Sequence, residues 1–168
     1  MKLSQLFLEQ LENEAESTRR VLERVPEGRN DWKPHGKSTS LGYLAALVAK
    51  MPAWIAMMVD RDEYELTSQD AKFQPVEAKS DRELLLAFDE AVAIGRQALQ
   101  KPSDDHLAKN WKFLVHGQIA AESPRYVALR DSMFSHWAHH RGQLTVYLRL
   151  NDAAVPAIYG PSADERGF

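Results

Sequence analysis

The 168-residue sequence contains no cysteine. This absence excludes a disulfide framework, a thiolate metal ligand and a cysteine nucleophile, so any metal ion must bind through nitrogen or oxygen. Basic residues are in slight deficit, because 21 Lys and Arg face 24 Asp and Glu and give a net charge of −3. A chain without a basic surplus is poorly suited to neutralising a phosphate backbone, so we expect no nucleic-acid partner.

Long apolar runs are also scarce. The N-terminus becomes acidic after a few apolar residues, unlike a secretory signal, and no window approaches the length of a transmembrane helix. With 44% hydrophobic and 27% charged residues, the composition is that of a compact soluble protein. We therefore expect a single domain over residues 1–168 that is cytoplasmic and has no membrane partner.

Helical periodicity occurs four times along the chain, whereas strand-like alternation never extends convincingly. Ser40 is a plausible N-cap for the second helix, and Pro52 should bend or split that helix. The third helix begins at a capping box formed by Ser80 and Glu83. The expected helices cover residues 3–25, 41–60, 81–101 and 124–150.

Four amphipathic helices joined by mid-length loops predict an all-α fold, a four-helix bundle whose facing side chains can build a site in the core. Residues 103–122 are less regular, and Trp111, Phe113 and Val115 indicate a short extended segment that the pattern does not place. The C-terminal tail, residues 155–161, is apolar and rich in proline. We expect this tail to pack back on the bundle.

Three imidazoles lie within five positions of the fourth helix: His136, His139 and His140. His136 and His140 are four residues apart, so their side chains emerge on neighbouring turns of one helix face. That spacing lets two imidazoles bind one metal ion. The alternative is a pair of hydrogen-bonded core histidines, a polar seam in an apolar bundle.

On a helical wheel of uniform period, the inward stripe of the fourth helix contains both of these histidines. His139 falls on the flank of the stripe, and Arg141 points the other way. Gln143 and Tyr147 are placed to orient a metal ion or a bound water. A catalytic zinc centre usually needs three protein ligands and one open position, so the pair requires a further group. The stripe consists of Leu129, Met133, His136, His140, Gln143 and Tyr147.

Residues 135–149, SHWAHHRGQLTVYLR, resemble the signature of the DinB family. The similarity extends to residues 32–38, 40–42 and 156–164 and covers most of the chain. This family is distinct from the DNA polymerase that shares its name. The resemblance implies a four-helix bundle, often a homodimer, in which three histidines hold a divalent metal ion. One histidine comes from the second helix and an HxxxH pair comes from the fourth.

His136 and His140 match the family's pair. Alignment of residues 40–48 places Leu47 where the first histidine is expected, and leucine cannot coordinate a metal ion. His35, in the loop before the second helix, is the leading substitute, although it also fits a solvent-exposed loop residue. His139 is a further candidate for third ligand or general base. His106 and His116 are expected to be surface histidines.

Two functions are consistent with these residues. The first is a metal-dependent hydrolase or thiol transferase that uses zinc or nickel on a small-molecule substrate, and any thiol must come from that substrate. The second is a non-catalytic bundle in which Leu47 has sealed part of the metal pocket. Such a protein would bind a small molecule or a partner protein. Both predict the same fold.

Overall fold

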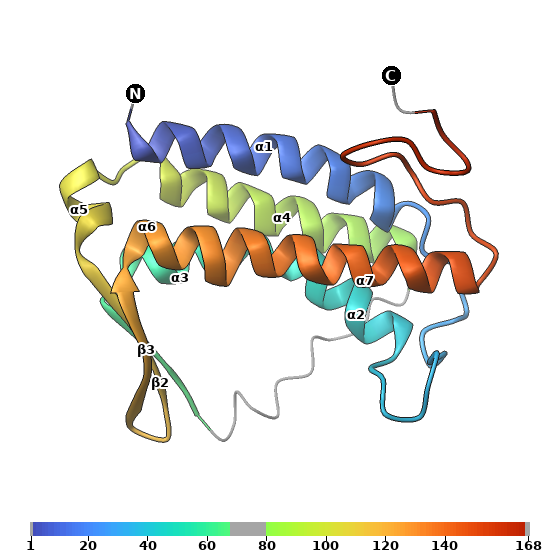
Figure 1. Ribbon diagram of the computed structural model, residues 1–168, viewed down its shortest axis with the longest axis horizontal. Coiled ribbons are helices and arrows are strands. Elements are labelled where there is room, and N and C mark those ends of the chain that lie inside the picture. Colours follow the sequence, from blue (N-terminus) through green and yellow to red (C-terminus); the bar gives the residue numbers. More distant parts are fainter. Residues whose placement is uncertain (1, 68–79, 167–168) are drawn as a thin grey trace.

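The computed structural model describes residues 2–67 and 80–166 (Figure 1). Residues 68–79, which fall between the second and third expected helices, lie outside the described residues. The helices are α1 (Leu3–Leu22), α2 (Leu41–Lys50), the 3₁₀ turn η1 (Met51–Ala53), α3 (Trp54–Asp60), α4 (Asp81–Leu99), α5 (Asp104–Ala108), α6 (Arg125–Ala128), the π-helix η3 (Leu129–Ser135) and α7 (His136–Leu150). The strands are β1 (Glu63–Leu66), β2 (Asn110–Val115) and β3 (Gln118–Pro124).

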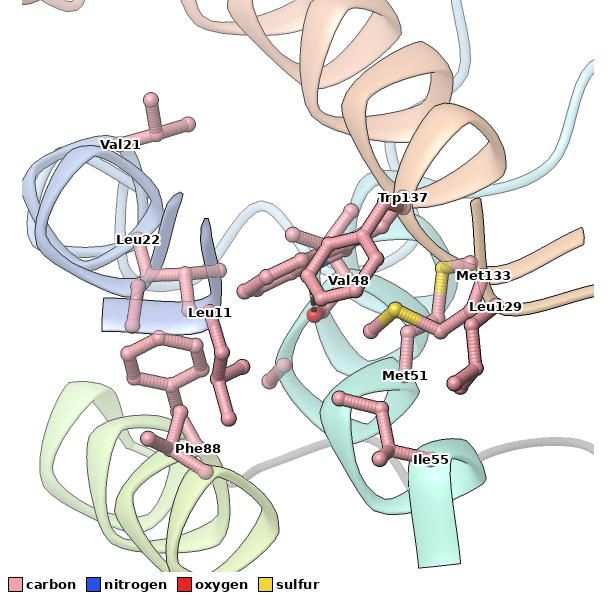
Figure 2. Close-up of a cluster of buried hydrophobic side chains, with 14 of the residues drawn as sticks. Leu11, Val21, Leu22, Val48, Met51, Ile55, Phe88, Leu129, Met133 and Trp137 are labelled. Carbon is pink, nitrogen blue, oxygen red and sulfur yellow. Dashed lines mark hydrogen bonds between the residues drawn. The ribbon is translucent and has the colours of Figure 1, made fainter. Parts of the chain in front are cut away.

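The long helices pack around one apolar core. In Figure 1, α1 runs alongside α4 and α7, α2 packs against α4 and α7, and α3 packs against α4 and η3. Each of these helices contributes fully buried side chains, because each repeats apolar residues at helical spacing. Figure 2 shows the centre of this core, which includes Leu11, Leu22, Val48, Met51, Ile55, Phe88, Leu129, Met133 and Trp137.

The prediction of an all-α fold is wrong, because β1, β2 and β3 form a three-stranded mixed sheet. β1 pairs with β2 in parallel, and β2 pairs with β3 antiparallel. The strands are only four to seven residues long, and the first five residues of β3 are exposed. The extended segment indicated by Trp111, Phe113 and Val115 is β2, but β1 is only four residues long, β3 is mostly exposed, and the pairing of β1 with β2 is non-local. The protein is therefore α/β.

Arg125 fixes this sheet to the helices. Its side chain is 1% exposed, and its guanidinium donates to the backbone carbonyls of Arg61 at 3.1 Å and Asn110 at 3.2 Å. It also forms an ion pair with Asp62. Arg61 and Asn110 lie at the starts of β1 and β2, so one buried cation satisfies the carbonyls where both strands begin.

The predicted N-caps at Ser40 and Ser80 are confirmed, whereas the fourth helix begins at Arg125 rather than at the predicted Pro124, which ends β3. The Ser40 hydroxyl accepts a hydrogen bond from the Tyr43 backbone N–H at 3.2 Å, and the Ser80 hydroxyl accepts one from the Glu83 backbone N–H at 3.3 Å. These bonds satisfy backbone donors that the first helical turn leaves without partners. The beginnings of α2 and α4 are therefore encoded locally.

The predicted break at Pro52 is confirmed, and its consequence reaches α7. In a regular helix the Val48 carbonyl would accept from the N–H of residue 52, but proline has none. The chain instead forms η1, and the Trp137 indole N–H donates to the Val48 carbonyl at 2.9 Å (Figure 2). Trp137 is 1% exposed, so this bond lies wholly inside the core.

Helix α4 approaches the same break closely at Gly95. A Cβ atom added there would lie 2.7 Å from the Pro52 carbonyl oxygen and 3.2 Å from the Ile55 Cδ1 atom. The first distance is shorter than any normal contact with backbone. Glycine is therefore required at position 95 for α4 to pack against η1.

The prediction that the C-terminal tail packs back on the helices is confirmed. Arg20 of α1 donates to the Ala157 carbonyl at 3.0 Å and pairs with Glu165. Arg149, at the end of α7, pairs with Asp164. The tail thus connects the ends of α1 and α7 through arginine–carboxylate contacts.

One apolar stretch corrects a prediction made from sequence. Leu41–Asp60 is 20 residues long with a mean hydropathy of 1.5, so it has the length and composition of a membrane span that the sequence was expected to lack. Within the protein, 61% of its apolar window is buried. Such burial is typical of a core helix, and the kink at Pro52 falls inside the stretch.

We predict that Trp137→Phe destabilises the protein by about 1–3 kcal/mol more than Trp111→Phe, as measured by urea unfolding. Both indoles are buried, but Trp111 Nε1 has no hydrogen-bond partner among the described residues. Only the first substitution leaves a buried carbonyl, that of Val48, without a donor. Equal losses of unfolding free energy would contradict the role assigned to this bond.

Two glycines inside helices should respond to alanine in opposite directions. Gly95→Ala is expected to lower the unfolding free energy by about 1–3 kcal/mol, because α4 must move away from η1. Gly142→Ala in α7 is expected to raise it by up to about 1 kcal/mol, because nothing lies within 4 Å of its added Cβ. Thermal unfolding of both variants measures the difference, and a stable Gly95→Ala protein would overturn the packing argument.

Candidate functional site

The π-helix η3 sets the orientation of the histidine-bearing helix. Leu129 and Met133, at its start and middle, are fully buried. A uniform α-helix would place His136 and His140 next on the buried stripe, but i→i+5 hydrogen bonding takes an extra residue into the turn. The buried positions that follow are therefore each one residue later than the wheel predicts: Trp137, Arg141, Leu144 and Leu148.

The predicted orientation of Arg141 is consequently wrong, because it faces the interior and is 2% exposed. Its guanidinium donates to the Thr18 hydroxyl at 3.0 Å and the Tyr159 hydroxyl at 2.6 Å, and it pairs with Glu14 at 2.6 Å. Thr18 and Glu14 lie on α1, more than a hundred residues away in the sequence, and Tyr159 lies in the tail that follows α7. No local sequence pattern predicts such an ion pair.

The same shift brings His136 and His140 to the edge of the core, where both are half-buried. Their Nε2 atoms face each other at 2.8 Å. The Nδ1–H group of His140 donates a hydrogen bond to the Gln143 side-chain oxygen, at 2.8 Å. The Ser132 backbone hydrogen-bonds the His136 ring from the preceding turn. The structure thus brings together the predicted pair and Gln143.

These outer hydrogen bonds decide which nitrogens are free. Carbonyl oxygens accept only from ring N–H groups, so Gln143 and Ser132 each hold one ring nitrogen in its protonated form. When both rings are neutral, their remaining lone pairs point toward each other across the 2.8 Å gap between the Nε2 atoms of His136 and His140. An oxygen acceptor on the outer nitrogen is the arrangement that orients metal-binding histidines.

The electrostatic environment favours the uncharged form of His136. Burial lowers the pKa of His136, and the adjacent His140 and His139 lower it further, while the Ser132 backbone opposes the shift in part. Neutral imidazole is the form that binds metal ions. Trp54 of α3 lies against the His136 ring, with ring centroids 5.9 Å apart, and contributes to this burial.

A groove with a volume of about 480 Å³ opens beside His140. Leu44 and Leu47 of α2 form one wall, and His140, Gln143 and Tyr147 of α7 form the other. Leu47 is half-buried and packs against the core, at the position where the family resemblance expects a histidine. The groove also includes Pro34, Ser38, Thr39, Tyr43 and Val146.

Tyr147 closes the groove at the loop before α2 and does not face the histidine pair. Its hydroxyl donates to the Thr39 carbonyl at 3.3 Å, and its ring meets Trp32 edge-on with centroids 5.5 Å apart. The sequence did not predict that Pro34, Ser38 and Thr39 line the groove. Loop residues carry no periodic signal, so only the packing of Tyr147 reveals them.

The proposed substitutes for a third ligand lie elsewhere. His35 is exposed, and its Nδ1 accepts from the Lys37 backbone N–H at 3.1 Å. His139 is exposed, with its ring centroid 5.2 Å from that of His140. Within residues 2–67 and 80–166, no three His, Cys, Asp or Glu side chains gather around one point. The described residues therefore supply two histidines and no third ligand of these types.

The two remaining histidines, His106 and His116, lie away from the histidine pair and have structural roles. His106 of α5 hydrogen-bonds the Val59 carbonyl at 2.8 Å and thereby joins α5 to the end of α3. His116 has a φ of 51° and Gly117 a φ of 73°, so these two residues form the tight turn between β2 and β3. His116 is exposed, as expected, whereas His106 contacts the body of the protein.

Known proteins share this fold of packed helices with a small sheet. The model of the DinB family matches residues 1–166. A DinB-like protein from Bacillus cereus ATCC 10987 superposes with a TM-score of 0.71, at 21% identity over 91% of this chain and 95% of that chain. The DinB-like protein YjoA from Bacillus subtilis gives a TM-score of 0.67, at 17% identity over 89% and 94%.

The chain therefore belongs to the DinB family. At these identities the two crystal structures establish a shared fold and nothing about activity. No curated protein sequence matches the chain at a significant level. The function must therefore be argued from the site itself.

Proposed function

We propose that His136 and His140 bind one divalent metal ion, zinc or nickel, and that the adjacent groove brings a small molecule to it. The reaction class is that of a metal-dependent hydrolase or thiol transferase. The observation that carries this proposal is the 2.8 Å approach of two Nε2 atoms whose outer nitrogens are held by Gln143 and Ser132. Two lone pairs at this distance repel each other unless a proton or a cation lies between them.

His136 and His140 can supply two ligands to a metal ion, but the described residues do not complete a three-ligand centre. Leu47 presents apolar surface where a third nitrogen would be needed, and it shares the groove with His140. Positions not filled by the two histidines would be left to water or to the small molecule. A metal ion there supplies Lewis acidity and lowers the pKa of a bound water or thiol.

The residues around the pair have separate tasks in this proposal. Gln143 and Ser132 orient the two rings, Trp54 shields His136 from solvent, and the groove admits the small molecule beside His140. The chain has no cysteine, so a reacting thiol belongs to the small molecule. A homodimer and a cytoplasmic location, expected from sequence, are part of the same proposal.

A second candidate is a metal-free protein that binds a small molecule or a partner without catalysis. The apolar wall formed by Leu44 and Leu47 supports it, because a sealed metal pocket would keep such a wall. In this case a proton between the two Nε2 atoms takes the place of the metal ion.

Titration of the tag-free protein with zinc and nickel separates the two candidates. We predict one equivalent of bound metal by isothermal calorimetry, and its loss in His136→Ala. His139→Ala is the matched control, because His139 lies on the same helix but is exposed. A wild-type protein that binds no metal would sink the metal proposal. Equal losses in both variants would show that His139 is a ligand and the two-histidine assignment is wrong.

Leu47→His tests whether the site is otherwise intact. Because Leu47 and His140 line the same groove from facing helices, an imidazole at position 47 should complete a three-nitrogen set. We predict a rise in metal affinity of at least about 100-fold, beyond the range of outer-shell changes. Competition with a chelating dye measures it. An unchanged affinity would mean that the groove has been remodelled.

A further inference from the structure

Among the residues that the structure describes, no charged side chain lines the groove beside His140. Two of its walls come from α2 and α7, and the third comes from the loop that precedes α2. Its apolar surface is provided by aliphatic side chains and proline, and its polar surface by hydroxyls, one amide and one imidazole. The complete lining is Pro34, Ser38, Thr39, Tyr43, Leu44, Leu47, His140, Gln143, Val146 and Tyr147.

The polar groups are not scattered evenly through the groove. His140 and Gln143 lie next to each other and are joined by a 2.8 Å hydrogen bond. That bond uses the Gln143 oxygen, which leaves the amide N–H groups of the same side chain directed elsewhere. At the loop end, the Tyr147 hydroxyl is already bound to the Thr39 carbonyl. Leu44 and Leu47 supply apolar surface between α2 and α7.

We infer that this groove binds a small uncharged molecule with an apolar body and one hydrogen-bonding head. The body would lie along Leu44, Leu47 and Val146, and the head would reach His140 and Gln143. A volume of about 480 Å³ is within the usual range for small-molecule sites. The inference names the class of substrate and so deepens the proposed function. It rests on the proposed function only for which end of the small molecule reacts, namely the head near His140.

Charge is the property that selects the ligand. In the metal-free groove, a carboxylate or ammonium group placed among these residues would lose water without gaining a counter-charge, which is costly. Lys33 and Lys37 flank lining residues along the chain, but both are exposed and neither lines the groove. The lining therefore favours an amide, alcohol or unionised thiol over an acid or an amine of the same shape.

Three compounds with one common body test this selection: phenylacetamide, phenylacetate and phenethylamine. Binding is measured by ligand-observed NMR and calorimetry, once with a chelator present and once with added zinc. We expect phenylacetamide to bind at least about tenfold more tightly than either charged compound in the presence of chelator. Equal or tighter binding of phenylacetate would overturn the inference, as would the absence of binding by phenylacetamide.

Two substitutions on α7 locate the binding event. Val146 lines the groove and is 56% exposed, whereas Leu150, one turn later and 55% exposed, does not line it. Val146→Asp should weaken phenylacetamide binding at least tenfold, and Leu150→Asp should leave it unchanged. Both positions are on the surface, so neither aspartate disturbs the core. Equal effects of the two substitutions would place the ligand outside the groove and refute the assignment.

The two proposals fail in different ways. Selective binding of phenylacetamide in chelator by a protein that takes up no zinc would support the groove assignment and refute the metal site. Zinc binding by His136 and His140 together with no preference among the three compounds would refute the groove assignment alone.

Discussion

Trp137 joins the start of α7 to the break between α2 and α3. Pro52 cannot donate the hydrogen bond that the Val48 carbonyl needs, and the Trp137 indole donates it instead, at 2.9 Å inside the core. Gly95 permits α4 to approach the same break. Three helices therefore meet at one proline, and the depth and rotation of α7 are fixed there. The position of the histidine pair depends on that rotation.

The π-helix η3 reconciles two demands on α7. Leu129 and Met133 are buried upstream, and Trp137 reaches Val48 downstream. One extra residue in the turn places Trp137 rather than His136 on the buried face, so His136 lies at the edge of the core and His140 lies on the wall of the groove. A helix of uniform period would bury the histidine pair, and the π-turn instead leaves it accessible.

Two buried arginines connect parts of the chain that are distant in sequence. Arg125 binds carbonyls at the starts of β1 and β2, and Arg141 binds Glu14 of α1 and Tyr159 of the tail. Each is nearly completely removed from solvent, so loss of its partners would leave an uncompensated buried charge. Arg141 immediately follows His140, so the network that holds the tail also holds the helix that carries the site.

The sequence by itself determined the features that depend on neighbouring residues: the helix starts at Ser40 and Ser80, the break at Pro52, and the four-residue spacing of His136 and His140. It also determined that Leu47 supplies no metal ligand. Tertiary structure alone decided the rest. The sheet, the burial of Arg141 and the rotation of the histidines all depend on hydrogen bonds and packing between segments far apart in the chain, and such pairings leave no trace in local periodicity.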